Sequence, residues 1–114
     1  MAADANIIGE GSGGHRGQPG SGFYITSVAV AKLANGRFRA TLSESWGSNQ
    51  GYLEEHGGNE VKGRGATWAE AISNAEQRAR DAKFNMKYLA QAVGDAESAC
   101  EDWEIAQEAD APSI

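Results

Sequence analysis

The chain has 114 residues, 40% of them hydrophobic and 23% charged, which is typical of a single globular domain. One cysteine, Cys100, excludes an intramolecular disulfide framework. The N-terminus lacks the order of a signal peptide, and no apolar run reaches the roughly 18 residues that span a bilayer, so we expect a soluble cytoplasmic protein. The acidic excess behind the net charge of −6 lies in residues 95–114, which contain no lysine or arginine.

Residues 1–22 are expected to form a flexible arm, because they are rich in glycine and poor in side chains that a core can bury. Only Asn6, Ile7 and Ile8 suit a brief strand. The run from Gly9 to Gly14 matches the Gly-x-Gly-x-x-Gly phosphate-binding pattern. That pattern needs a strand before it and a helix after it, and neither is predicted here, which favours a flexible tail.

A β-hairpin is predicted over residues 23–46, because two strand-like segments flank Asn35-Gly36. A two-residue type I′ turn there pairs Ala34 with Arg37 and fixes the register. The predicted core face then carries Ile25, Ala29, Ala31, Leu33, Phe38, Ala40, Leu42 and Trp46. The opposite face carries Tyr24, Thr26, Val28, Val30, Lys32, Arg39, Thr41 and Ser43, and is either an interface or an ordinary exposed strand surface.

Residues 60–64 predict a short third strand, and Thr67 and Glu70 form a capping box that begins a helix. One apolar stripe follows at helical spacing: Ile72, Ala75, Ala79, Ala82, Met86, Leu89 and Val93. Its alanines are expected to lie against the hairpin alanines, with a break at Gly94. The sequence therefore predicts an α+β fold: an antiparallel hairpin and a short third strand packed under a long helix in a domain over 23–94, then a second, acidic helix over 95–114.

Residues 65–75 resemble the Gly-x-Thr-x-x-Glu-Ala-x-x-Asn-Ala segment of HicB-type antitoxins. The element order, with Gly63-Arg64-Gly65 before the helix, is similar to the β-β-β-α half of double-stranded-RNA-binding domains. The first resemblance implies a small basic toxin as partner, and the second implies nucleic-acid binding. Ala66, Trp68 and Ala69 stand where RNA-binding members place lysines, and the acidic end differs from the DNA-binding segment of HicB-type proteins.

The acidic end carries the main functional prediction. On a helix, Glu97, Glu101, Glu104 and Glu108 form one stripe, whose spacing of roughly 5–6 Å resembles the charge array of a nucleic-acid strand. Small phage and mobile-element proteins, including anti-CRISPR inhibitors, are similar in size and charge balance. We therefore expect a non-enzymatic inhibitor or adaptor that engages a basic surface of a nucleic-acid-handling protein. The expected contact residues are Glu97, Glu101, Asp102, Trp103, Glu104 and Glu108. The alternative is a solubilising tail.

A second hypothesis places nucleic acid on a basic track, formed by Lys32, Arg37, Arg39, Lys62, Arg64, Arg80, Lys83 and Lys87. Acidic residues interleave with these cations on the helix, which favours an ordinary charged surface. We expect no catalytic centre, cofactor or metal site, because His15, His56 and Cys100 cannot be assembled with a third group. Glu54 and Glu55 are expected to be solvated. The sequence leaves the oligomeric state open.

Overall fold

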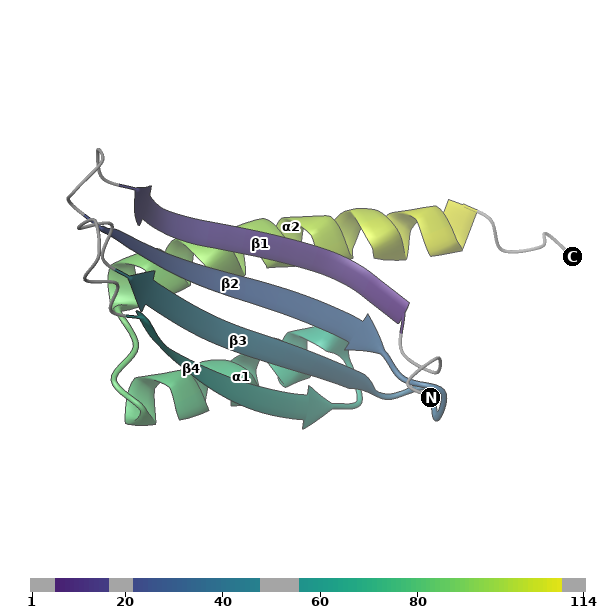
Figure 1. The fold of residues 1–114 in the computed structure, drawn as a ribbon. Helices are drawn as coiled ribbons and strands as arrows, with labels where there is room; N and C mark the ends of the chain where they lie inside the picture. Colours follow the sequence, from purple (N-terminus) through teal and green to yellow (C-terminus); the bar gives the residue numbers. More distant parts are fainter. Residues whose placement is uncertain (1–5, 17–21, 48–55, 110–114) are drawn as a thin grey trace, which may run out of the picture.

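The computed structural model describes residues 6–16, 22–47 and 56–109, with the side chains of Arg16 and His56 excepted. Four antiparallel strands form one sheet in the order β1-β2-β3-β4, and two helices cover one of its faces (Figure 1). The predicted α+β class is confirmed. The elements are β1 (Asn6–Arg16), β2 (Phe23–Lys32), β3 (Phe38–Gly47), β4 (His56–Gly65), α1 (Trp68–Asp81) and α2 (Met86–Ala109).

The turn between β2 and β3 differs from the predicted type I′ turn. Gly36 has a φ of 83°, but Asn35 does not have the positive φ that a type I′ turn requires. The Gly36 N–H donates to the Leu33 carbonyl at 3.0 Å, and the Leu33 N–H donates to the Arg37 carbonyl at 2.8 Å. The loop is therefore a type I turn followed by a left-handed glycine, which adds one residue to the connection.

The extra loop residue shifts the register by one, so that Lys32 pairs with Phe38. A shift of one residue turns every side chain of a strand to the other face. Val28 and Val30 are buried under the helices, whereas Ala29 lies on the opposite, outer face. The predicted core face was correct for β3 at Ala40 and Leu42, which are buried, whereas Trp46 on the same face is 39% exposed. For β2 the predicted face was wrong: Ile25 and Ala29 lie on the outer face, although Ala31 is buried.

Strand β1 replaces the predicted flexible arm over residues 6–16 and pairs with β2 along its length. Three of its glycines face α2: a Cβ added to Gly11 would lie 2.1 Å from the Ala92 carbonyl oxygen. Gly9 and Gly13 are placed in the same way against α2. Their missing side chains let the helix lie directly on the strand, so the glycines form a packing surface. The predicted arm over 1–5 and 17–21 lies outside the described residues.

Strand β4 spans His56–Gly65 and is longer than the predicted 60–64. It pairs with β3 over its whole length and carries α1 on its inner side. A Cβ added to Gly63 would lie 2.2 Å from the Ala75 backbone nitrogen. The helix alanines therefore do pack on small residues of the sheet, as expected. Those residues are glycines of the edge strands and not the alanines of the hairpin.

Helix α1 begins as predicted, with the Glu70 N–H donating to the Thr67 hydroxyl at 3.1 Å. The Glu70 carboxylate accepts from the Ala66 N–H at 3.3 Å. The helix ends early, because Lys83 adopts a φ of 64° and the N–H groups of Lys83 and Phe84 return to the carbonyls of Arg80 and Ala79. Phe84 is only 3% exposed, so its burial holds this reversal against the core.

Helix α2 begins after Asn85, whose side-chain oxygen accepts from the Tyr88 N–H at 3.2 Å. It continues through Gly94 to Ala109, so the predicted break at Gly94 was wrong. Gly94 lies on the exposed side of the helix and costs some stability without ending it. Of the predicted stripe, Ile72, Ala75, Ala79, Leu89 and Val93 are buried, whereas Ala82 and Met86 lie exposed at the reversal.

Candidate functional site

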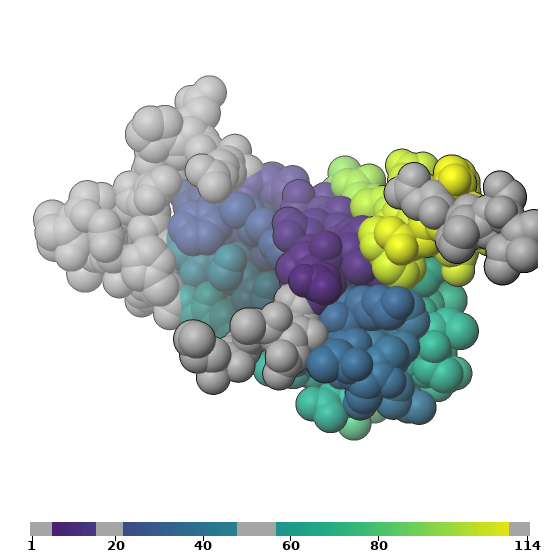
Figure 2. Space-filling view, turned by 90° about the vertical axis from the view of Figure 1, so that its right-hand side faces the viewer, coloured from purple at the N-terminus to yellow at the C-terminus, as the bar shows by residue number. Residues whose placement is uncertain are grey.

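The C-terminal turns of α2 carry the predicted acidic surface and project past the end of β1 (Figure 1). Trp103 fixes this part of the helix to the domain. Its ring meets Phe38 edge-on, with ring centroids 6.0 Å apart, and the Lys32 ammonium lies 5.7 Å from the ring centroid. Trp103 is thus an internal anchor, and the Lys32 ammonium packs on its ring. Figure 2 shows this end, where α2 (yellow) lies beside β1 (purple) and the hairpin tip (blue).

The carboxylates beyond this anchor are open to solvent. Glu101, Asp102, Glu104 and Glu108 are exposed, and within the described ranges none of them has a lysine or arginine at ion-pair distance. Glu97 is half-buried. Burial raises the pKa of Glu76, Arg80 at 3.9 Å lowers it in part, and Glu97 adds to the rise. Glu97 therefore lies near Glu76, on the flank of α2 that faces α1.

Cys100 lies under the acidic stripe, against Gly9 of β1. Burial raises the pKa of its thiol to about 11, and the neighbouring Glu97 and Glu104 add to the rise. The thiol is therefore protonated and inert at neutral pH. Cys100 belongs to the packing of α2 on β1.

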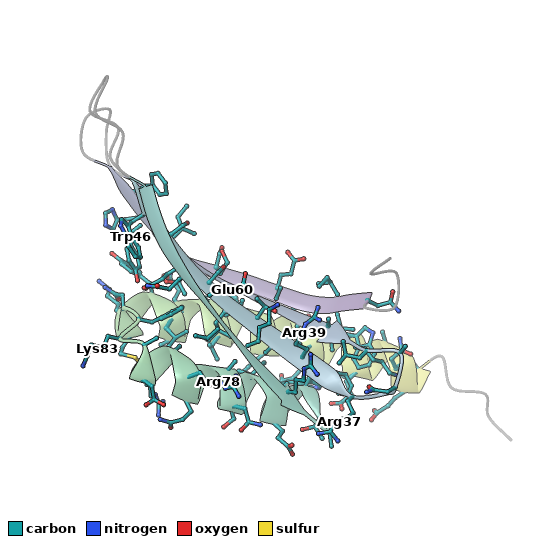
Figure 3. The ribbon with its side chains drawn as sticks, turned by 60° about the horizontal axis from the view of Figure 1, so that its bottom comes forward. Arg37, Arg39, Trp46, Glu60, Arg78 and Lys83 are labelled. Atoms are coloured by element: carbon teal, nitrogen blue, oxygen red, sulfur yellow. The ribbon has the colours of Figure 1, made fainter. Side chains whose placement is uncertain are left out.

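The eight predicted basic residues do not form one track. Arg39 and Arg64 are direct neighbours on β3 and β4, and Arg37 lies in the turn beside them. Lys62 lies two residues before Arg64 in β4, on the same outer face. Lys83 and Lys87 lie at the opposite end of the sheet, near the α1–α2 connection, and Arg80 pairs with Glu76 on α1. Figure 3 shows Arg39 on the side of the sheet away from the helices, and Lys83 on the helical side.

A buried polar cluster joins the sheet to the α1–α2 connection, and sequence reasoning missed it. Glu44 is 6% exposed and accepts hydrogen bonds from the Tyr24 hydroxyl and, at 2.8 Å, from the Asn59 amide. The Tyr24 oxygen accepts from the Asn85 N–H at 3.3 Å, and the Tyr24 ring stacks on Trp46. Tyr24 was predicted on the outer face, so only the corrected register brings it beside Glu44. Because both oxygens of the Glu44 carboxylate accept hydrogen bonds, this side chain links β3 to β2 and to β4.

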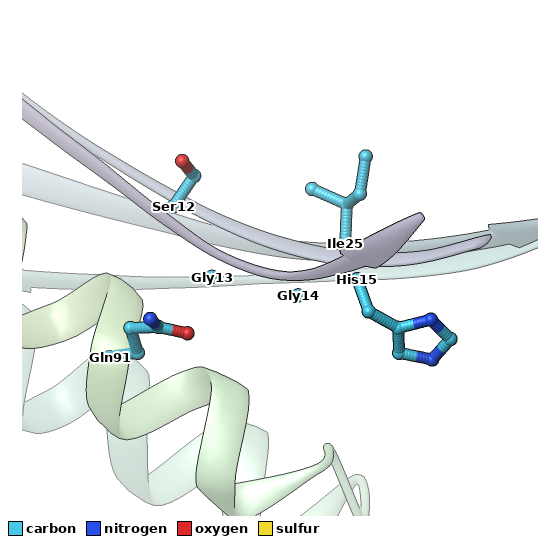
Figure 4. A pocket seen from close by; sticks show the side chains of 6 residues that line it. All are labelled: Ser12, Gly13, Gly14, His15, Ile25 and Gln91. Atoms are coloured by element: carbon cyan, nitrogen blue, oxygen red, sulfur yellow. The ribbon is translucent and has the colours of Figure 1, made fainter. Parts of the chain in front are cut away.

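A hollow of about 400 Å³ opens at the edge of β1, lined by Ser12, Gly13, Gly14, His15, Ile25 and Gln91. Gln91 and His15 approach it from the helical side, whereas Ser12 and Ile25 point to the other face (Figure 4). The His15 ring packs on Tyr88, with centroids 5.8 Å apart. In the part of the chain that the structure describes, no three His, Cys, Asp or Glu side chains are grouped to hold a metal.

Neither described helix is long and apolar enough to cross a membrane. The predicted loop carboxylates Glu54 and Glu55 lie outside the described residues, as does the side chain of His56. Comparison with family models, curated proteins and solved structures finds no match to this chain.

Proposed function

We propose that this chain is a non-enzymatic binding protein, an inhibitor or adaptor that engages a positively charged surface of a nucleic-acid-handling protein through the exposed end of α2. The observation that carries the proposal is the set of exposed carboxylates at Glu101, Asp102, Glu104 and Glu108, which have no ion-pair partner among the described residues. Exposed unpaired charges of one sign attract a complementary surface and orient its approach.

The anchoring of this helix supports the same conclusion. Trp103 packs on Phe38 and Cys100 lies against β1, so the carboxylates project from an ordered support. A preordered surface loses less conformational entropy on binding than a flexible tail does. The cations are divided between two ends of the molecule, which favours the acidic surface over a nucleic-acid track.

The test is a pull-down from lysate of the native host over a series of salt concentrations. The double variant Glu101→Gln/Glu104→Gln removes two exposed charges and keeps the helical preference of both positions. The control Glu70→Gln/Asp81→Asn removes two exposed charges from α1, and glutamine keeps the capping box at position 70. Two surface ion pairs correspond to roughly tenfold in affinity, so the first variant should retain the partner about tenfold less well than the control.

Added salt should release the captured partner, because salt screens the attraction between the opposite charges. Duplex DNA should displace it, because DNA competes for the same basic groove. Equal retention by the two variants, or capture that high salt leaves unchanged, would contradict the proposal.

A further inference from the structure

The outer face of the sheet carries no covering element among the described residues, and both helices lie on the inner face (Figure 1). The strand registers arrange this face in rows across β1, β2, β3 and β4. One row consists of Glu10, Ala29, Thr41 and Lys62, and the next consists of Ser12, Ser27, Ser43 and Glu60. In these two rows the central strands present short side chains, and the longer Ile25 and Arg39 project from the neighbouring rows of the same face.

This outer face is large enough for a stable interface. Three strands of ten residues and one of eleven present roughly 600 Å² at the usual spacings within a sheet, so two such faces bury roughly 1,200 Å² together. That area is at the lower limit of specific protein interfaces. Short side chains also let two sheets pack closely.

The charges on the face are self-complementary. Glu10 and Lys62 stand at opposite ends of the same row, and both are exposed. The Lys62 ammonium also lies 3.8 Å from the carboxylate of Glu60 on its own strand, an exposed pair that leaves Lys62 accessible to a second carboxylate. A two-fold axis along the strands, between β2 and β3, turns β1 of one copy over β4 of the other. Each Glu10 then lies over Lys62 of the second copy, and Ala29 lies over Thr41. Aligned sheets pack with their strands within about 30° of each other, which keeps these rows close.

We propose that a second copy of this chain covers the outer face, forming a symmetric sandwich of two sheets held by two Glu10–Lys62 ion pairs. Such an interface uses the same patch on both copies, as two-fold dimers do. The acidic ends of both α2 helices remain on the outsides of the dimer. The inference goes beyond the proposed function and is tested without the partner, so either proposal can fail alone.

The test is sedimentation of the full chain over a range of concentrations from micromolar to millimolar. The wild type should dimerise reversibly. Glu10→Lys places like charges opposite each other at two places, and should weaken the dimer roughly 30-fold. Asp81→Lys makes the same change in net charge on the exposed side of α1, and should leave dimerisation unchanged.

The charge reversal identifies the geometry. The double variant Glu10→Lys/Lys62→Glu recreates both ion pairs with reversed signs and should restore the dimer to nearly wild-type affinity. A protein that stays monomeric at all concentrations would overturn the proposal, as would a dimer that Glu10→Lys leaves intact. Binding of duplex DNA or RNA by the monomer, lost in Lys62→Glu, would assign the face to nucleic acid and also overturn it.

Discussion

Strands β1 and β4 form the two edges of the sheet, and each carries one helix on glycine. On β1, Gly11 meets the backbone of α2 at Ala92, and on β4, Gly63 meets α1 at Ala75. The two halves differ in how their sequences look. Strand β4 places Val61 and charged residues between its glycines, whereas β1 reads as Gly-Glu-Gly-Ser-Gly-Gly. Both edge strands pack a helix on glycine, but the sequence of β4 looks like a strand and the sequence of β1 looks like a linker.

Glycine has two opposite roles that composition cannot separate. In a free linker, glycine raises the entropy of the chain. On β1 its missing side chain lets α2 approach the sheet, so the helix covers backbone that a larger residue would hold away. Substitutions at Gly11, Gly94 and Lys83 test whether the packing on β1, and not chain flexibility, accounts for its glycines.

The largest effect is expected from Gly11→Ala. The new Cβ would lie 2.1 Å from the Ala92 carbonyl oxygen and 2.6 Å from the Ala96 nitrogen, so α2 must move away from β1. We expect a loss of about 3 kcal/mol in the free energy of unfolding, the upper range for overpacking. Chemical denaturation measures it. A loss close to zero would show that β1 does not support α2.

The reactivity of Cys100 reports on the same contact. With its pKa raised from 9.0 to about 11, its thiolate at pH 8 is roughly 100-fold scarcer than that of an unperturbed thiol. Modification by a thiol reagent should be slower by at least this factor, and faster in Gly11→Ala. The raised pKa also means that the protonated thiol stabilises the fold below pH 9.0, and that this stabilisation is lost as the pH rises through about 11. Rapid modification of the native protein would contradict burial of the thiol.

The matched control for Gly11→Ala is Gly94→Ala, the same change in α2 but on the exposed side of that helix. A Cβ at Gly94 meets nothing within 4 Å, and the residue lies inside a helix. Alanine should therefore increase the free energy of unfolding by about 1 kcal/mol. A loss of stability at Gly94 would indicate that α2 is broken there.

The smallest effect concerns Lys83, which separates the two helices. Its φ of 64° is unfavourable for a side chain with a Cβ, and the position corresponds to the glycine that usually ends a helix. Lys83→Gly should increase the free energy of unfolding by about 0.5–1 kcal/mol. A Lys83→Ala variant, which keeps the strain and removes the charge, should show no such gain.

The sequence predicted the elements whose signals are local. The Thr67 cap, the buried positions Ile72 and Leu89, and the inner face of β3 follow from capping chemistry and periodicity. The predicted register of β2 was wrong because Asn-Gly suits both a two-residue and a three-residue loop. A difference of one loop residue exchanges the two faces of the strand. The end of α1 was missed because a lysine, Lys83, adopts the left-handed conformation that glycine usually marks.

The candidate site was predictable only in part. The exposed carboxylates from Glu101 to Glu108 could be read from helical spacing and an absence of nearby cations in the sequence. The role of Trp103 as an internal anchor depends on Phe38 and Lys32, which lie far away in the sequence. The Glu44 cluster depends on the register of β2 and on the position of the α1–α2 connection, and neither is a local property.

Amide hydrogen exchange of residues 6–16 and of α2 tests most directly whether β1 is the strand that carries the acidic helix. The β1 amides that donate to β2, and the α2 amides on both sides of Gly94, should be protected and should exchange with similar opening free energies, because the two elements pack as one unit. Exchange of residues 6–16 at the rate of an unfolded chain, with α2 protected only up to Gly94, would show that β1 does not support the acidic helix.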